Sequence, residues 1–272
     1  MRISIVALGC VAALAAAPVA RAADAVAERL YILDCGQSVA KDQSRWSPGV
    51  NEGVPIEFAD NCYLIRHARG VLLWDTGYPD SYAARPEGVV GMGGLSVARR
   101  AKTLGAQLAA LGVTPLDITY VAISHTHGDH IGNLDQFPDS TLIFQQAEFD
   151  WAFTDKPKPF PDGQAVKKLA GDFDVFGDGS LVVLSTPGHT PGHQSLMVRL
   201  AKTGVVLLSG DAVHFLANWE NRRVPAINFD RAQTLASMQR LADLVAQHKG
   251  QLWINHDKPQ SDRLAKSPAF FE

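Results

Sequence analysis

Residues 118–130 read ITYVAISHTHGDH, an apolar and β-branched run that leads directly into three histidines and an aspartate. The run at 118–124 is typical of a buried strand. In an α/β protein such a strand brings the chain to the carboxyl edge of a sheet, where sites commonly form. Side chains alternate along an extended segment, so the first two histidines and the aspartate face one side, and the last histidine opens the next element. Imidazole and carboxylate are ligands that zinc prefers. The cluster therefore predicts a metal site rather than a solvated polar turn, with candidate ligands His125, His127, Asp129 and His130.

Three further candidate ligands follow other strand-like runs. His189 stands in STPGHTPGHQS (185–195), Asp211 in SGDAVH (209–214) and His256 in WINHD (253–257). If these strands end at one edge, the three side chains converge on the first cluster. Four groups around one tetrahedral ion are strained, whereas seven groups suit two ions. We therefore expect two divalent metal ions, with zinc the first choice.

The other histidines in the strands and helices have a different interpretation. His67 and His248 lie in ordinary strand and helix contexts, and we interpret them as structural or surface residues. His193 is interpreted as a core histidine or one that lies behind the ligands.

The hydrophobic pattern predicts alternating strands and helices in two β-rich halves. Residues 78–94 are turn-rich and predict a long loop, and apolar spacing predicts a helix over 96–111 and another from Asp230 to Gly250. The segments GVLLWDTG (70–77) and GVVLLSGDA (204–212) are similar, since each is an apolar strand that ends in an aspartate near glycine. This similarity indicates two related halves with helices outside, a layered α/β/β/α arrangement. Strands are predicted at 29–35, 61–67, 70–77, 118–124, 141–146, 180–186, 195–200, 204–210 and 251–255.

Composition is that of a globular protein with a sizeable core. The chain has 272 residues, 46% of them hydrophobic and 19% charged, and no Pro/Ser/Gly-rich linker divides it. We expect one domain over residues 23–272. Without Arg2 and Arg21 the chain carries 23 basic and 28 acidic residues, a net charge of −5. Such a balance gives no electrostatic reason to bind nucleic acid.

The first residues predict export. Arg2 is followed by an apolar run from 3 to 17 and by Ala20-Arg21-Ala22, the pattern of a secretory signal peptide over residues 1–22. The apolar run is shorter than the ~20 residues that a spanning helix needs, so we expect no stable membrane insertion after cleavage. The mature protein is then periplasmic or secreted.

Two cysteines, Cys35 and Cys62, remain after the predicted cleavage. An oxidising compartment allows a disulfide between them. Neither lies in a Cys-x-x-Cys arrangement and both follow apolar or strand-like context, so two buried free thiols are slightly favoured.

The ordered set HTHGDH, TPGHTPGHQS, GDA and NHD resembles the metallo-β-lactamase superfamily of hydrolases, over essentially the whole mature chain. The resemblance implies an αββα four-layer sandwich. It also implies one metal on His125, His127 and His189, and a second on Asp129, His130 and His256. Asp211 would bridge the two metals, and Asp75 of LLWDTG would support the site through a ligand imidazole.

A dinuclear centre of this kind implies hydrolysis by a metal-bridging hydroxide. Asp129 is expected to orient the nucleophile and pass its proton to the leaving group. Within the superfamily, the bridging Asp211 argues against penicillin as the main substrate, and His127 argues against the flavodiiron proteins, which have Glu there. The C-terminal QSDRLAKSPAFFE has few of the basic residues of the glyoxalase-type thioesterases.

Within the superfamily the chain most resembles the N-acyl-homoserine lactonases that quench quorum sensing. The segments that carry this resemblance are NCYLIRHARGVLLWDTGYP (61–79), TPGHTPGHQSL and NFDRAQTLASMQRLADL (228–244). It implies opening of the five-membered lactone ring of a small-molecule substrate. Those lactonases often place a tyrosine three residues after the bridging aspartate, where this chain has His214. Imidazole can donate a hydrogen bond and act as a general acid, so His214 is a candidate catalytic residue beside Asp129.

An acyl chain requires an apolar groove, and several large side chains lie in loops or beside the ligand segments. The resemblance also leaves other activities open: an exported phosphotriesterase or arylesterase on the same dimetal site, and a metal-storage protein without turnover. The native metal, the acyl-chain length and the oligomeric state are also open. The candidates for the groove are Trp46, Met92, Trp151, Phe153, Phe215 and Trp219.

Overall fold

The computed structural model describes residues 26–272, so the predicted signal peptide at 1–22 lies outside the described residues. Two sheets make up the centre, with strand orders β4-β5-β1-β2-β3-β6-β7-β8 and β13-β12-β11-β10-β9. Among the described residues, no helix is both long and apolar enough to cross a membrane. The strands are β1 Arg29–Ala40, β2 Ile56–His67, β3 Gly70–Trp74, β4 Val89–Gly91, β5 Ser96–Arg99, β6 Tyr120–Ala122, β7 Thr141–Gln145, β8 Val166–Leu169, β9 Phe173–Asp174, β10 Leu181–Ser185, β11 Gln194–Leu200, β12 Gly204–Leu208 and β13 Gln251–Trp253; the α-helices are α1 Leu104–Ala110, α2 Gln146–Phe153, α3 Leu216–Asn221, α4 Arg231–His248 and α5 Lys258–Ser261.

The two sheets pack face to face because their strands bury both faces. In β1, Leu30 and Ile32 point into the cluster between the sheets, where Val183 and Val206 of the other sheet meet them. Their neighbour Leu33 points outward to the cluster under α1 and α2. This two-residue alternation is the geometry of a strand, and burying each such side chain contributes about 1.5–3 kcal/mol.

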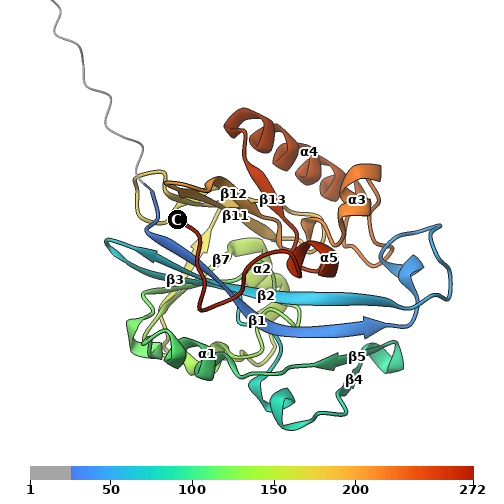
Figure 1. Ribbon diagram of the computed structural model, residues 1–272, viewed down its shortest axis with the longest axis horizontal. Helices are drawn as coiled ribbons and strands as arrows, with labels where there is room; N and C mark the ends of the chain where they lie inside the picture. Colours follow the sequence, from blue (N-terminus) through green and yellow to red (C-terminus); the bar gives the residue numbers. More distant parts are fainter. Residues whose placement is uncertain (1–25) are drawn as a thin grey trace, which may run out of the picture.

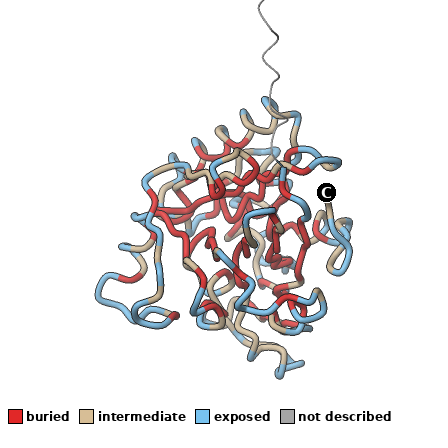
Figure 2. Tube along the Cα trace, turned by 90° about the vertical axis from the view of Figure 1, so that its left-hand side faces the viewer, coloured by how far each residue is buried: buried red, intermediate tan, exposed pale blue. Residues whose placement is uncertain are grey.

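Helices close both outer faces. Leu104 and Leu108 of α1 pack on the eight-stranded sheet, and Leu241 of α4 packs on the five-stranded sheet. Figure 1 shows α4 above one sheet and α1 beneath the other, and Figure 2 shows the buried chain concentrated between these outer layers. The predicted αββα sandwich is confirmed.

Helix α4 forms where its capping signal predicts. The Asp230 side chain accepts a hydrogen bond from the Gln233 backbone N–H at 2.9 Å, which satisfies one of the free donors at the helix start. The helix ends at a left-handed Lys249, immediately before Gly250. The predicted helix from Asp230 to Gly250 is therefore confirmed.

The region between residues 78 and 111 differs from its prediction. Residues 96–99, predicted as helical, form β5, and α1 begins only at Leu104, where Thr103 caps it. β1 extends to Ala40, and its last four residues pair with β5 from Gln37↔Arg99 to Ala40↔Ser96. The free edge of the longer β1 therefore determines the structure of β5, and this non-local pairing overrides a helical spacing. The predicted loop at 78–94 includes β4, which pairs with β5.

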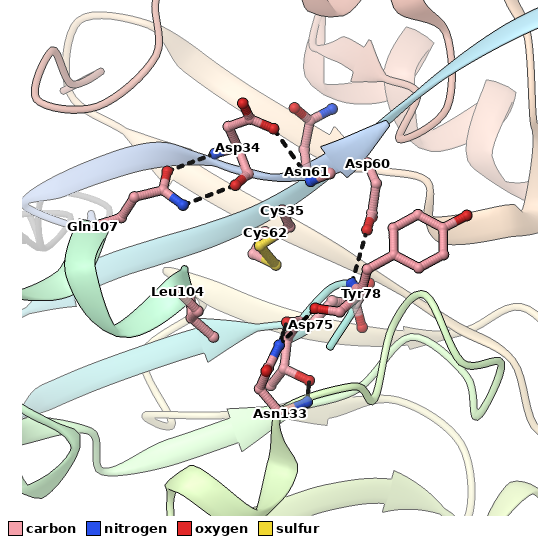
Figure 3. The surroundings of a disulfide bond; sticks show 12 residues. Asp34, Cys35, Asp60, Asn61, Cys62, Asp75, Tyr78, Leu104, Gln107 and Asn133 are labelled. Atoms are coloured by element: carbon pink, nitrogen blue, oxygen red, sulfur yellow. Dashed lines mark hydrogen bonds between the residues drawn. A yellow bond between two sulfur atoms is a disulfide. The ribbon is translucent and has the colours of Figure 1, made fainter. Parts of the chain in front are cut away.

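The prediction of free thiols is wrong, because Cys35 and Cys62 form a disulfide. β1 and β2 are antiparallel neighbours, and a register shift between Asp34 and Gly36 leaves Cys35 out of the regular pairing. This bulge brings the two Cα atoms to 5.7 Å, within the normal range for a disulfide. Figure 3 shows the bond in the interior, near the turn that carries Asp75 and Tyr78.

Candidate metal centre

The strand ends bring the candidate ligands to one edge. β3 and β6 are parallel and reach this edge together, with Trp74 opposite Ala122. In the other sheet, β12 and β13 are parallel and end together, with Leu208 opposite Trp253. Parallel strands present their carboxyl ends on the same side, so the segments that follow them converge.

All seven predicted ligands meet at this edge, in two groups. Within each group the potential ligand atoms lie within 4.8 Å of one another. The grouping matches the sequence-based assignment, in which one half-site and the bridging aspartate are separate from the other half-site. The groups are His125, His127, His189 and Asp211, and Asp129, His130 and His256.

Asp211 contacts both groups with different oxygens. Its Oδ2 lies 3.6 Å from Nε2 of His125 and 3.4 Å from Nε2 of His189. Its Oδ1 lies 3.0 Å from Nε2 of His256 and 3.5 Å from Nε2 of His130. One carboxylate therefore joins the two groups.

The polar atoms of this centre fit a divalent cation. Nδ1 of His127 is 2.9 Å from Nε2 of His125 and 3.1 Å from Nε2 of His189, so three ring nitrogens face one point. Nε2 of His130 and Oδ1 of Asp211 are buried without a hydrogen-bond partner. Unpaired buried polar atoms are costly, and a cation among these lone pairs would satisfy them. This cluster therefore indicates divalent metal binding.

Supporting contacts hold the imidazoles of His130 and His256 with Nε2 inward. Nδ1 of His130 lies 2.9 Å from Oδ2 of Asp75, whose other oxygen accepts the Ser124 N–H at 2.6 Å. Nδ1 of His256 donates to the Ala59 carbonyl at 2.7 Å. Such contacts fix the tautomer and ring orientation of a metal ligand. The contact that the resemblance implied for Asp75 is present.

Burial and the central carboxylates shift the pKa values of the site in opposite directions. Burial lowers the pKa of His125 and His189 well below the ordinary value. Burial also opposes the charge on His256, but Asp211 and Asp129 outweigh it and raise that pKa to about 9. For Asp211, the surrounding histidines outweigh burial and hold its pKa well below the ordinary value. The centre thus keeps an anion that attracts cations.

Four histidines lie outside the ligand groups, and three of them, all except His214, also lie outside the cavity lining. His193 is buried behind the site, where its Nε2 accepts the Asp211 N–H at 2.9 Å. His67 is also buried, lies 3.0 Å from Asp178 and pairs with Gly70 at the start of β3, the opposite end of that strand from the centre. His248 ends α4. These placements agree with the interpretation from sequence.

A cavity of about 510 Å³ opens onto the centre. Part of its lining consists of candidate ligands that include His127, Asp129 and His189. The rest is mostly apolar and comes largely from β1, β2, β4 and β5 together with the segments between them. The apolar lining includes Ala40, Trp46, Phe58, Val89, Met92 and Ala98.

Only two of the six predicted groove residues, Trp46 and Met92, line this cavity. Phe215 instead packs behind Phe58, with ring centroids 5.0 Å apart, and Phe153 is buried under the eight-stranded sheet. Phe58 was missed because the sequence pattern placed the start of its strand at 61, whereas β2 begins at Ile56. The remaining two, Trp151 and Trp219, also lie outside the cavity lining.

His214 lines the same cavity, next to Asp211. Its Nε2 is 3.2 Å from Oδ2 of Asp211, and its Nδ1 is buried without a hydrogen-bond partner. One ring nitrogen is therefore near the central carboxylate, and the other has no partner within residues 26–272.

Comparison with known proteins supports the same fold. An N-acyl homoserine lactonase of Azorhizobium caulinodans is 33% identical over 267 residues, covering 90% of this chain and 98% of that one. One from Bacillus cereus is 31% identical, covering 89% and 98%. A solved quorum-quenching N-acyl homoserine lactone hydrolase has a TM-score of 0.79 at 27% identity, covering 91% of this chain and 100% of that chain. Another, with N-hexanoyl-L-homoserine bound at its catalytic metal centre, has a TM-score of 0.78 at 29% identity, covering 90% and 99%.

The family model of the Metallo-beta-lactamase superfamily matches residues 56–247, which include most of the ligand-bearing segments described above. His256, the one ligand candidate beyond that match, lies within a fold that the solved relatives share over nearly their whole length. The chain belongs to the metallo-beta-lactamase superfamily.

Proposed function

We propose that this protein is a dinuclear, metal-dependent lactonase that opens the ring of N-acyl-homoserine lactones. The observation that carries the proposal is one cavity lined both by residues of the ligand cluster and by apolar side chains. That combination suits a substrate with a polar ring to be hydrolysed and an apolar tail. The relatives named as N-acyl homoserine lactonases support the same substrate class.

The ligand groups suggest how two ions would be held. His125, His127 and His189 would hold one, Asp129, His130 and His256 would hold the other, and Asp211 would bridge them. Zinc suits this set of imidazoles and carboxylates. When bound, divalent ions of this kind acidify water and polarise a carbonyl oxygen, the two requirements of ester hydrolysis.

Asp129 and His214 are the proposed proton-handling residues. Ring opening forms a bond between a water oxygen and the acyl carbon and breaks the bond to the ring oxygen, which takes up a proton. Asp129 lines the cavity, so its carboxylate can accept the proton of the attacking water. His214 also lines the cavity, and we assign its imidazole to donate a hydrogen bond to the lactone.

We also propose that the protein is exported. Residues 1–22 would be a signal peptide, and residues 23–272 one hydrolase domain that acts in the periplasm or outside the cell. The support is the basic start, the short apolar run and Ala20-Arg21-Ala22.

The substrate is tested by offering the zinc-loaded protein N-decanoyl-homoserine lactone, paraoxon and nitrocefin, with acid release followed by pH-stat. We expect the lactone to be the best substrate. Faster hydrolysis of paraoxon would favour the phosphotriesterase alternative, and full metal occupancy without any turnover would favour metal storage.

The role of His214 is tested separately with His214→Ala. Loss of a general acid or its hydrogen bond predicts a fall in lactone hydrolysis of ~100-fold or more. Metal content is measured in parallel, because His214 lies near Asp211. A variant that retains its metal and hydrolyses the lactone within a few-fold of wild type would refute this role.

A further inference from the structure

Glu148 is a buried acid that lies beside the metal centre without belonging to it. It stands in the first turn of α2 and is 1% exposed, although its neighbours Gln146, Ala147 and Asp150 are exposed or only partly buried. Within residues 26–272, no basic side chain forms an ion pair with it. Burying a carboxyl group without a cationic partner is unfavourable unless other donors compensate.

The donors that compensate come from two separate loops. Oε1 of Glu148 accepts the Thr126 backbone N–H at 2.8 Å and the Thr126 hydroxyl at 2.7 Å. Oε2 accepts the Gly192 backbone N–H at 3.1 Å. One side chain therefore ties the loop after β6 to the loop after β10.

Both loops carry ligands of the same half-site. Thr126 lies between His125 and His127, and Gly192 lies three residues after His189. The backbone of α2 also lies directly against the second loop, since a Cβ added to Gly192 would lie 2.2 Å from the Glu148 nitrogen. Glycine is thus required at 192 for this close approach.

The other half-site is held by different groups. His130 is held by Asp75 and His256 by the Ala59 carbonyl, and Glu148 forms hydrogen bonds with neither histidine nor with the residues that hold them. The Ser124 hydroxyl is shared by the two half-sites, because its Oγ lies 3.1 Å from Nδ1 of both His125 and His130. The side-chain hydrogen bonds of Glu148, in contrast, reach only Thr126 and Gly192.

We infer that Glu148 is a positioning residue for the half-site formed by His125, His127 and His189. It keeps the two ligand loops at the spacing at which their three ring nitrogens face one point. It reaches neither the cavity nor the ligand atoms, so it acts only through Thr126 and Gly192. This inference rests on the proposed dinuclear centre.

The test is Glu148→Gln, which keeps the size of the side chain. Glutamine offers one oxygen and one NH₂ group, whereas both oxygens of Glu148 accept hydrogen bonds. If the glutamine oxygen faces Thr126, its NH₂ group faces the Gly192 N–H, and neither of these two donors has an acceptor. Supporting groups of metal ligands typically affect metal affinity by ~10–100-fold. We expect one of two zinc equivalents to be released to a competing chelator at ~10–100-fold lower chelator concentration, with the second equivalent unchanged.

Two further variants make the result specific. Asp150→Asn removes the same charge from an exposed position of the same helix, where the Asp150 side chain accepts a hydrogen bond from Gln146 and lies 3.8 Å from Nζ of Lys168. We expect it to release both equivalents as the wild type does. Thr126→Val removes only the hydroxyl donor, so it should lower the affinity for the same zinc equivalent by less than Glu148→Gln does. If Glu148→Gln fails to fold, the result for Thr126→Val decides the question.

A purely structural role predicts a different pattern. It would lower the melting temperature of the metal-free protein while both zinc equivalents kept their affinity, and that result overturns the inference. If the wild type binds a single equivalent, the dinuclear proposal fails. The inference about Glu148 then stands if Glu148→Gln lowers the affinity for that single zinc equivalent and Asp150→Asn does not. It falls if neither variant lowers this affinity.

Discussion

The Cys35–Cys62 disulfide should contribute a measurable part of the stability of this fold. The bond links residues 27 positions apart in the sequence. For a loop of this size, the lost chain entropy of the unfolded state corresponds to about 3.5 kcal/mol at 25 °C. We therefore expect reduction to lower the free energy of unfolding of the wild-type protein by about 3.5 kcal/mol.

The assay is urea unfolding of the zinc-loaded protein with and without a phosphine reductant. The free energy of unfolding of a chain of this length falls by ~3 kcal/mol per M urea. A change of about 3.5 kcal/mol therefore moves the unfolding midpoint by roughly 1 M urea. Cys35→Ala with Cys62→Ala is the matched control, because it reports any effect of the reductant on the metal or the solvent. Its midpoint should be low in both conditions and unaffected by the reductant.

Two results would refute this reasoning. The first is a wild-type midpoint that the reductant does not change beyond its effect on the double variant. The second is the alkylation of two free thiols in unreduced, denatured wild-type protein, which would show that the bond is absent in solution.

Three further predictions follow from the site, the cavity and a buried lysine. Removal of metal by a chelator should abolish lactone hydrolysis and lower the melting temperature, and added zinc should restore both; activity that persists in metal-free protein would contradict the proposed centre. Ala98→Phe should narrow the apolar part of the cavity, which Ala98 lines together with its pairing partner Ser38. We expect it to lower kcat/KM for a decanoyl lactone by ~10-fold or more while a butanoyl lactone is hydrolysed nearly as before; equal losses for both substrates would place the tail elsewhere. Burial lowers the pKa of Lys266 from its ordinary 10.5 to about 8, so between these pH values the unfolded chain holds a proton that the folded protein has released. The free energy of unfolding of wild type, relative to Lys266→Met, should therefore rise from pH 8 to 10.5, and urea unfolding at both ends of this window checks the sign.

The ligand residues were predictable from the sequence because each depends on a local pattern. His125 and its neighbours follow an apolar strand, and so do Asp211 and His256. A buried strand that ends in polar ligand-type side chains indicates an edge site without knowledge of the partners. The helix that begins after Asp230 was predictable for the same reason, since its cap and apolar spacing are properties of one segment.

The errors lie where distant segments decide the outcome. Residues 96–99 have a spacing that fits a helix, but the extended edge of β1 is available to pair with them. Cys35 and Cys62 have no local feature that indicates pairing, and it is the bulge between two neighbouring strands that brings them together. Phe58 lines the cavity because of the length of β2, which the local pattern underestimated.

The sequence by itself determined the αββα layers and the set of candidate ligands, because hydrophobic periodicity and strand-end chemistry are local. The resemblance implied how those ligands are shared, but only the tertiary structure decided the contacts by which they are shared and supported. It directs the two oxygens of Asp211 toward different histidine groups, and it places Glu148 between the loops of Thr126 and Gly192. These relations depend on where segments more than 20 residues apart meet in space, which only the packing of the two sheets and their helices fixes.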